Sequence, residues 1–145
     1  MASSVRIERL GPGDEPRILA AAELFDEVPT KAFTGRWLSQ DTNHLLVAYE
    51  GAEAAGFVSG IEVAHPDKPV EMLLYELGVR DASQRRGIGR ALVEALGALA
   101  VERGCAGMWV LTDADNEAAL RTYRAAGAGE PSPQVMLEWN FPPSE

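Results

Sequence analysis

The sequence predicts an α+β fold, a mixed α/β arrangement around a central mixed sheet, with the element order βααβββαβαβ. Stretches that alternate apolar and polar residues, or that are apolar throughout, are typical of strands, and they are interleaved with stretches of helical apolar spacing. Glycine and proline separate these stretches. The 145 residues, 46% of them hydrophobic, are the usual size of one domain with its own core. Residues 1–145 are therefore expected to form a single domain.

The N-terminal half is predicted to begin with a strand and two helices. Residues 5–10 alternate apolar and polar side chains, as a strand with one buried face does, and a Gly-Pro-Gly sequence ends that strand. A helix opens after it and ends before Pro29, and a second short helix is expected over residues 31–39. Residues 45–49 and 54–63 then form a hairpin across a short turn.

The C-terminal half is predicted to alternate strands and helices. Residues 70–79 are an almost unbroken apolar run, as in a strand inside a sheet. Residues 88–103 have the strongest helical pattern of the chain, and Gly104 ends that helix. A buried strand, a helix and a last strand follow at residues 107–111, 116–126 and 135–141.

The chain is acidic overall but contains one basic segment. Thirteen Lys and Arg against 22 Asp and Glu give a net charge of −9, which argues against nucleic acid as a partner and favours a cationic one. Residues 80–90, in contrast, carry four arginines and a single acidic residue, Asp81. This distribution predicts an anionic ligand at the basic segment and a cationic ligand elsewhere.

The sequence favours a cytoplasmic protein that holds no metal. The longest apolar helical stretch falls short of the ~20 residues of a membrane span, and residues 1–8 lack the apolar core of a leader. The single cysteine, Cys105, reads as a small packing residue and fits a reducing compartment. His44 and His65 show no partner pattern, and no cluster has metal-ligand spacing. The three tryptophans are expected to be packing residues, although Trp37 could border an acceptor cleft.

A glycine-rich loop lies between the buried strand and the strongest helix. Gly87 and Gly89 let the backbone approach a ligand, and the free N–H groups at the helix start would face it together with the positive end of the helix dipole. The alternative is a mere tight turn, but Arg85 and Arg86 favour an anion site. The ATP-binding loop pattern is absent, and the dinucleotide pattern lacks its third glycine. A pyrophosphate-binding loop is therefore predicted.

Glu76 is the strongest candidate for a catalytic residue. A carboxylate within an apolar strand is unfavourable unless it is paired or lines a cleft, and such surroundings raise its pKa toward the range of a general base. The alternative is a side chain that points into solvent from a strand edge. Glu71, at the start of the same strand, is a weaker candidate.

The motif Gln84-x-x-Gly87-x-Gly89 resembles the signature of the GNAT superfamily of N-acetyltransferases. The preceding Tyr-Glu-Leu-Gly-Val at residues 75–79 resembles the fourth strand of that fold, and the predicted element order matches over essentially the whole chain. The resemblance implies acetyl-CoA as co-substrate, with the strand backbone beside its pantetheine arm and the loop amides on its pyrophosphate. The contacts implied are Leu77, Gly78, Val79, Gln84, Arg85, Arg86, Gly87, Ile88, Gly89, Arg90, Asn116 and Tyr123.

The last predicted helix places Asn116 and Tyr123 on one face, two turns apart. In the GNAT pattern a tyrosine at this place protonates the departing CoA thiolate, and an asparagine at the helix start contacts the pantetheine. The resemblance therefore implies Tyr123 as the general acid and Glu76 as the base. The alternative for Tyr123 is a core residue whose hydroxyl is satisfied by a hydrogen bond.

For the acceptor, the sequence is similar to the aminoglycoside 3-N-acetyltransferases of the gentamicin type. The similar segments are residues 9–12, 21–25, 75–79 and 113–123, with a Glu for the family's Asp at Glu76 and an Asn for its Asp at Asn116. The resemblance implies a polycationic small-molecule amine, bound by Glu76, Asp113 and Asp115, and an antibiotic-resistance activity. It also allows a homodimer through a sheet edge.

Other readings stay open at this point. For Asp115 and Glu117, helix N-capping and compensation of the helix dipole are the alternative to substrate contact. The acceptor could instead be a polyamine, another metabolite amine or a protein N-terminus. A non-catalytic acetyl-CoA-binding module is a further alternative, which the presence of both Glu76 and Tyr123 argues against.

Overall fold

The computed structural model describes residues 4–144. Met1–Ser3, which are part of the segment considered for a leader, and Glu145 lie outside the described residues. The elements, in chain order, are β1 (Val5–Leu10), α1 (Glu15–Ala20), η1 (Ala22–Leu24), α2 (Lys31–Leu38), β2 (Asn43–Glu50), β3 (Glu53–Val63), β4 (Glu71–Val79), η2 (Asp81–Ser83), α3 (Ile88–Glu102), β5 (Met108–Val110) and α4 (Glu117–Ala125).

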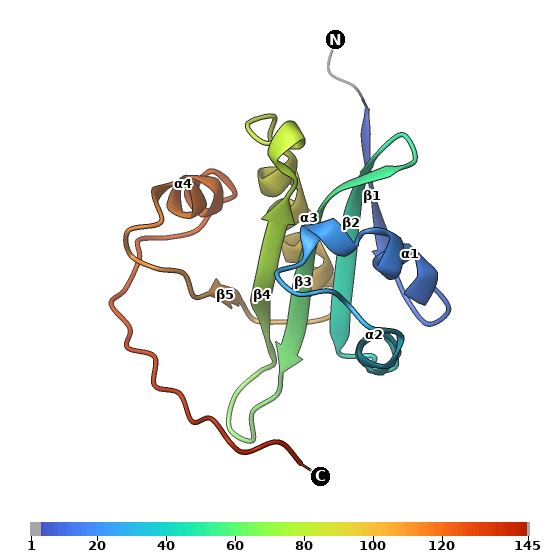
Figure 1. The fold of residues 1–145 in the computed structure, drawn as a ribbon. Coiled ribbons are helices and arrows are strands. Elements are labelled where there is room, and N and C mark those ends of the chain that lie inside the picture. The colour runs from blue at the N-terminus through green and yellow to red at the C-terminus, as the bar shows by residue number, and fades with distance from the viewer. Residues whose placement is uncertain (1–3, 145) are drawn as a thin grey trace.

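One five-stranded sheet, in the order β1-β2-β3-β4-β5, organises the molecule. Strands β1 to β4 pair antiparallel, whereas β4 and β5 are parallel, so the sheet is mixed as the sequence predicts. In Figure 1, α3 covers one face of the sheet, and α1 and α2 cover the other face over the first strands. The α4 helix lies beside the β4–β5 side of the sheet.

Two apolar clusters, one on each face, hold the layers together. Leu92 and Leu96 of α3 pack against Val58 in one cluster, and Ile18 of α1 packs with Phe57 in the other. Val58 and Phe57 are neighbours in β3, and they face opposite sides because successive side chains of a strand alternate. All five side chains are at most 4% exposed. The strand pattern therefore positions both helical layers.

The predicted elements are confirmed up to α4, except that the strand expected to be buried at residues 107–111 is not buried, since Trp109 is 39% exposed. Two further corrections concern the extent of the elements. The first predicted helix is shorter than expected: α1 ends at Ala20, and only the 3₁₀ turn η1 continues it before Pro29. The predicted last strand is wrong, because residues 135–141 are extended without strand pairing. Their alternating pattern is that of a strand, but a strand also needs a partner ladder. Trp139, expected to pack, is accordingly 74% exposed.

Within residues 4–144, no helix is long and apolar enough to cross a membrane.

Candidate active site

A β-bulge in β4 determines where Glu76 points. Glu76 pairs with Ser59 of β3, but the next pair is Leu74 with Gly60, so Tyr75 is an extra residue in β4. An extra residue reverses the alternation of side chains along a strand. The displaced amide of Glu76 donates a hydrogen bond to the Ser59 hydroxyl at 3.1 Å.

After the bulge, Glu76 faces away from α3. Leu77 and Val79 pack against the α3-side cluster. Gly78 lies on the other face, where an added Cβ would come within 2.8 Å of Phe57 and 3.0 Å of the Leu24 carbonyl. Because Glu76 is two residues from Gly78, its side chain also lies on the α1/α2 face. The bulge therefore places this carboxylate on the α1/α2 face of the sheet and not in the α3-side core.

The surroundings of Glu76 favour its protonated form. The residue is partly buried, and this burial, together with the nearby Asp26 carboxylate, raises the pKa of Glu76 above its ordinary value. Asp26 lies in the segment between η1 and α2 and is exposed. A carboxyl group with a raised pKa beside a second carboxylate is suited to accept a proton from a cationic amine.

The edge of β4 beyond the bulge has no partner strand on the β5 side. Strand β5 pairs only with Met72, Leu73 and Leu74, whereas Leu77, Gly78 and Val79 pair with β3 on the opposite side. Within the described chain, β4 and β5 therefore diverge after Leu74. The exposed backbone groups of such an edge can pair with an extended ligand that carries amides.

The loop between β4 and α3 offers backbone amides to a ligand. Gly87 is the N-cap of α3 with a φ of 82°, no side chain caps the helix, and its first turn contains no acidic residue. A Cβ at Gly87 would meet nothing within 4 Å, so the approach is open. The Gln84 side chain fixes the loop by donating to the Val79 carbonyl at 3.0 Å. These features fit a pyrophosphate group, because free N–H groups and the helix dipole attract anions.

Three of the four arginines in residues 80–90 form ion pairs, two of them with acidic residues far away in the sequence. Arg80 forms ion pairs with Glu50 at 3.1 Å and Glu53 at 2.7 Å, and Arg86 also pairs with Glu50. Arg90 pairs with Glu94 at 3.3 Å. The excess of arginines counted along residues 80–90 is therefore smaller in space than in sequence. Arg85 is exposed and has a φ of 64°, which is unusual for a residue other than glycine.

Tyr123 lies on the face of α4 that packs toward the sheet. It is partly buried against the α3-side cluster, to which Leu77 and Val79 also belong. Its neighbour Thr122 would be 3.4 Å from a Cβ at Gly89, so α4 closely approaches the start of α3. Burial raises the pKa of the Tyr123 phenol above its ordinary value. A phenol in these surroundings keeps its proton and can donate it.

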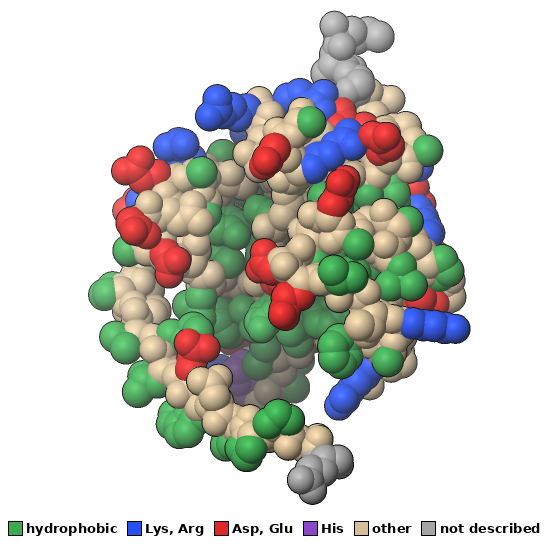
Figure 2. All heavy atoms as spheres, in the orientation of Figure 1, with side chains coloured by type: hydrophobic (Ala, Val, Ile, Leu, Met, Phe, Trp, Pro, Cys, Tyr) green, Lys and Arg blue, Asp and Glu red, His purple; other side chains and the backbone are tan. Residues whose placement is uncertain are grey.

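The start of α4 shows which residue caps this helix, a role that the sequence left open for Asp115. Asn116 is the N-cap, and its Oδ1 accepts a hydrogen bond from the Ala119 amide at 3.1 Å. Asp115 is not the cap, and the Asp113, Asp115 and Glu117 side chains are exposed. Figure 2 shows a hollow in this face with hydrophobic side chains at its floor and acidic side chains on both sides. Lys and Arg side chains gather at the end that carries the β4–α3 loop.

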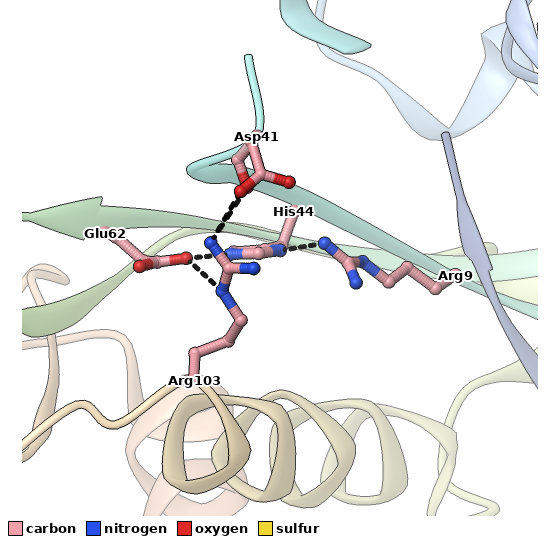
Figure 3. A network of polar contacts seen from close by, with 5 residues as sticks. All are labelled: Arg9, Asp41, His44, Glu62 and Arg103. Carbon is pink, nitrogen blue, oxygen red and sulfur yellow. Dashed lines mark hydrogen bonds and ion pairs between the residues drawn. The ribbon is translucent and has the colours of Figure 1, made fainter. Parts of the chain in front are cut away.

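A second polar cluster, which the sequence patterns do not indicate, lies at the opposite end of the sheet (Figure 3). The His44 side chain is buried and contacts Glu62 at 2.6 Å through Nε2, while Arg9 donates to its Nδ1 at 2.9 Å. Because an arginine can only donate, Nδ1 accepts and Nε2 carries the proton. Arg103, the C-cap of α3, joins Glu62 at 2.7 Å and Asp41 at 3.0 Å. The cluster therefore ties β1, β2, β3 and α3 together.

Both histidines have partners in the fold, although the sequence shows no partner pattern for them. Burial is the main cause that lowers the pKa of His44, and the hydrogen bond to Glu62 only partly opposes it. Burial acts to raise the pKa of Glu62, but the hydrogen bonds from His44 and Arg103 outweigh it and the pKa is lowered. His65 likewise contacts Glu71 at 3.0 Å. The members of the His44 cluster lie up to 94 residues apart along the chain, from Arg9 to Arg103, so no local pattern could reveal that cluster.

Comparison with known proteins places the fold in a family. The chain is 37% identical over 109 residues to the N-alpha-acetyltransferase RimI of Mycobacterium tuberculosis, an alignment that covers 73% of this chain and 66% of that protein. It spans no more than two thirds of the length of the curated relatives that it matches.

Solved structures agree on the fold. An aminoglycoside acetyltransferase from an uncultured soil metagenomic sample, meta-AAC0020 in complex with trehalose, superposes with a TM-score of 0.87 at 23% identity, over 94% of this chain and 96% of that chain. A second one from soil, HMB0005, superposes with a TM-score of 0.76 at 28% identity, over 97% and 99%. The family model for the acetyltransferase (GNAT) family matches residues 14–128. The chain therefore belongs to the acetyltransferase (GNAT) family.

Proposed function

We propose that this chain transfers the acetyl group of acetyl-CoA to an amine of a polycationic small molecule, namely the 3-amino group of an aminoglycoside. The observation that carries the proposal is the position of Glu76. The β4 bulge directs this carboxylate to the open face beside Asp26, next to the free edge of β4. A base for the amine and a binding edge for the thioester thus come from consecutive residues.

Acetyl-CoA binding is assigned to the β4 edge and to the start of α3. The backbone of Leu77, Gly78 and Val79 would pair with the pantetheine arm, because β5 leaves this edge open. The amides from Arg85 to Arg90 would hold the pyrophosphate in the loop kept in place by Gln84. Asn116 uses its side-chain oxygen as a helix cap, so only its Nδ2 group would be available for the pantetheine.

The two titratable groups have complementary tasks in this proposal. Glu76 takes a proton from the acceptor ammonium, directly or through a water molecule, and the free amine nitrogen then attacks the thioester carbonyl carbon. When the carbon–sulfur bond breaks, the Tyr123 hydroxyl gives its proton to the sulfur, and the second proton lost by the nitrogen restores the Tyr123 phenol. The raised pKa of Glu76 brings it closer to that of an amine, and the raised pKa of Tyr123 keeps the phenol protonated.

The acidic surface supports a cationic acceptor. The chain has a net charge of −9, and acidic side chains flank the hollow in Figure 2. In the proposal Asp113 and Asp115 contribute to binding the acceptor because both are exposed before α4. Attraction between separated charges raises both the association rate and the local concentration of a polycation.

A second candidate acceptor is the α-amine of a protein. It is favoured by the 37% identity to an N-alpha-acetyltransferase. The same base and acid would serve it, since the chemistry at the amine is unchanged. The difference lies in the acceptor surface, which would have to accommodate an extended peptide.

A panel of acceptors distinguishes these proposals. The purified chain is incubated with acetyl-CoA and gentamicin-type or kanamycin-type aminoglycosides, spermidine or peptides with free N-termini, and free CoA and acetylated product are measured. We expect turnover of gentamicin-type aminoglycosides with the product acetylated at the 3-amino group. Turnover of peptides alone would replace the acceptor. If calorimetry detected no acetyl-CoA binding either, the whole assignment would be wrong.

A further inference from the structure

The carboxylate of Glu50 connects the end of β2 to the segment that leads into the β4–α3 loop. Glu50 is the last residue of β2, and its side chain is 12% exposed. Its Oε1 accepts hydrogen bonds from the Ser83 hydroxyl at 2.6 Å and from the Arg80 guanidinium at 3.1 Å. Its Oε2 accepts one from Arg86. One carboxylate thus receives donors from three positions within residues 80–86.

Ser83 is the buried part of this arrangement. Its side chain is fully buried, and its hydroxyl accepts a hydrogen bond from Arg80 Nε at 2.6 Å while it donates to Glu50. The backbone amide of Arg80 in turn donates to the Ala55 carbonyl at 2.9 Å. The chain that enters the loop is therefore attached to both β2 and β3.

Between Ser83 and Arg86 the backbone has an unfavourable conformation. Arg85 has a φ of 64°, and this left-handed conformation is strained for a residue with a Cβ. Such a conformation persists only where the surrounding structure fixes it. Glu50 contacts the chain on both sides of Arg85, at Ser83 and at Arg86. Its carboxylate therefore stabilises a loop conformation that the chain by itself disfavours.

A negative charge beside an anion site has two opposite effects. It repels a bound pyrophosphate, but it can also hold the loop that binds this group. The charge of Glu50 is already compensated by Arg80 and Arg86, so its repulsion of a third group is small. Loss of its contacts, in contrast, would release the loop on both sides of Arg85. The geometry therefore favours the holding effect.

We propose that Glu50 is a positioning residue for acetyl-CoA. It acts through Ser83 and Arg86, without touching the ligand, and holds the β4–α3 loop in the conformation in which the amides from Arg85 to Arg90 face the pyrophosphate. The role in acetyl-CoA binding rests on the proposed function. The effect on the loop does not, because it is measured without any ligand.

Three variants separate this role from a general effect of charge. Glu50→Gln keeps the shape of the side chain but leaves one acceptor oxygen, and its NH₂ group would face a donor. Glu53→Gln is the matched control: it removes the same charge from a side chain that pairs with Arg80 at 2.7 Å but is 76% exposed. Ser83→Ala removes one contact and leaves the carboxylate in place. Its effects should have the same sign as those of Glu50→Gln and be smaller, and it replaces Glu50→Gln if that variant does not fold.

Trypsin tests the hold on the loop. Cleavage after Arg85 or Arg86 requires the loop to leave its folded conformation, and its rate follows the population of the open form. In Glu50→Gln this cleavage should be about tenfold faster than in the parent chain, and in Glu53→Gln it should be unchanged. Mass spectrometry identifies the fragments, and thermal unfolding verifies that the variants are folded. Equal cleavage rates in Glu50→Gln and the parent chain would overturn the proposal.

Calorimetry with acetyl-CoA tests the effect on binding. The Kd of Glu50→Gln should rise about tenfold, with no rise in Glu53→Gln, and in turnover the KM for acetyl-CoA should rise while kcat stays within about twofold. Equal or tighter binding by Glu50→Gln would overturn the positioning role alone, because it would show Glu50 to be neutral or a competing charge. A parent chain that binds no acetyl-CoA would overturn the proposed function as well.

Discussion

The Glu76 amide donates to the Ser59 hydroxyl at 3.1 Å, at the one place where the pairing of β3 and β4 shifts. Ser59 is 4% exposed. The bulge takes the amide out of the regular ladder, and the hydroxyl replaces the lost acceptor. This single contact therefore supports the backbone conformation that directs Glu76 to the open face.

Ser59→Ala should destabilise the protein. A buried N–H group left without an acceptor costs about 1–3 kcal/mol, so the free energy of unfolding in urea should fall by that amount. Ser39→Ala is the control, since the Ser39 hydroxyl donates to the Arg36 carbonyl at an exposed site and its loss should cost less than about 0.5 kcal/mol. Equal stability of the two variants would contradict a role of Ser59 in holding the bulge.

Asp26→Asn should lower the pKa of Glu76. Burial and the Asp26 charge both raise that pKa, so removing the charge lowers it, and the acidic limb of the kcat/KM profile moves to lower pH. Glu27→Gln removes one charge at the adjacent exposed position and serves as the control. We expect the limb to keep its place in Glu27→Gln. A shift to higher pH in Asp26→Asn would show that another group governs the limb.

Glu76→Gln should lose activity and gain stability. Loss of a general base lowers kcat by roughly 10²–10⁴. The folded pKa of Glu76 is raised, so the folded protein binds more protons than the unfolded chain, and stability falls as pH rises from the unfolded pKa through the folded pKa. A neutral side chain removes this loss, and Tm at pH 7–8 should rise. A lower Tm would mean that ionised Glu76 makes compensating contacts.

Gly87→Ala and Gly104→Ala form a matched pair. The two glycines have φ angles of 82° and 81°, and a Cβ at either meets nothing within 4 Å. Both substitutions should therefore cost about 1 kcal/mol or more of stability. Only Gly87→Ala should weaken acetyl-CoA binding in calorimetry, by about tenfold, which corresponds to ~1.4 kcal/mol. Equal affinities would show that the loop amides do not contact the ligand.

His44→Gln should make the free energy of unfolding depend less on pH on the acidic side of neutrality. The folded pKa of His44 is lowered, so the unfolded chain binds more protons, and stability is lost as pH falls below the ordinary histidine pKa of about 6.5. Glutamine can still donate to Glu62 but does not titrate. The slope of the unfolding free energy between about pH 7 and 5 should therefore decrease. His65→Gln is the control, and an equal change in both variants would exclude a specific role of the buried histidine.

The sequence patterns predicted the parts of the fold that depend on near neighbours. Helical spacing locates α3 within one residue of its observed end, and Gly87 of the predicted loop is its N-cap. The bulge could not be predicted, because residues 70–79 are apolar almost throughout and a shift of one residue leaves no trace in such a run. The positive φ of Arg85 likewise has no sequence pattern that would predict it.

Interactions between distant residues account for the remaining differences. The partners of His44 and the neutralisation of Arg80 by Glu50 and Glu53 join segments that only the folded sheet brings together. The strand expected at residues 135–141 shows the opposite case. Its pattern is that of a strand, but no pattern specifies which strand it would pair with.

The bulge at Tyr75 determines which face of the sheet each side chain of β4 points to. Upstream of it even-numbered residues such as Leu74 face α3, and downstream of it odd-numbered residues such as Leu77 do, so that Glu76 faces the other side. If Tyr75 were taken into the regular ladder, the two roles would be exchanged, with Glu76 in the hydrophobic layer and Leu77 on the open face; deletion of Tyr75 would leave both where they are. Point substitutions at Asp26 or Asp113 do not change that alternation of side chains along β4. The bulge therefore sets the side of the sheet on which Glu76 lies, whereas single side chains around it set only the local charge.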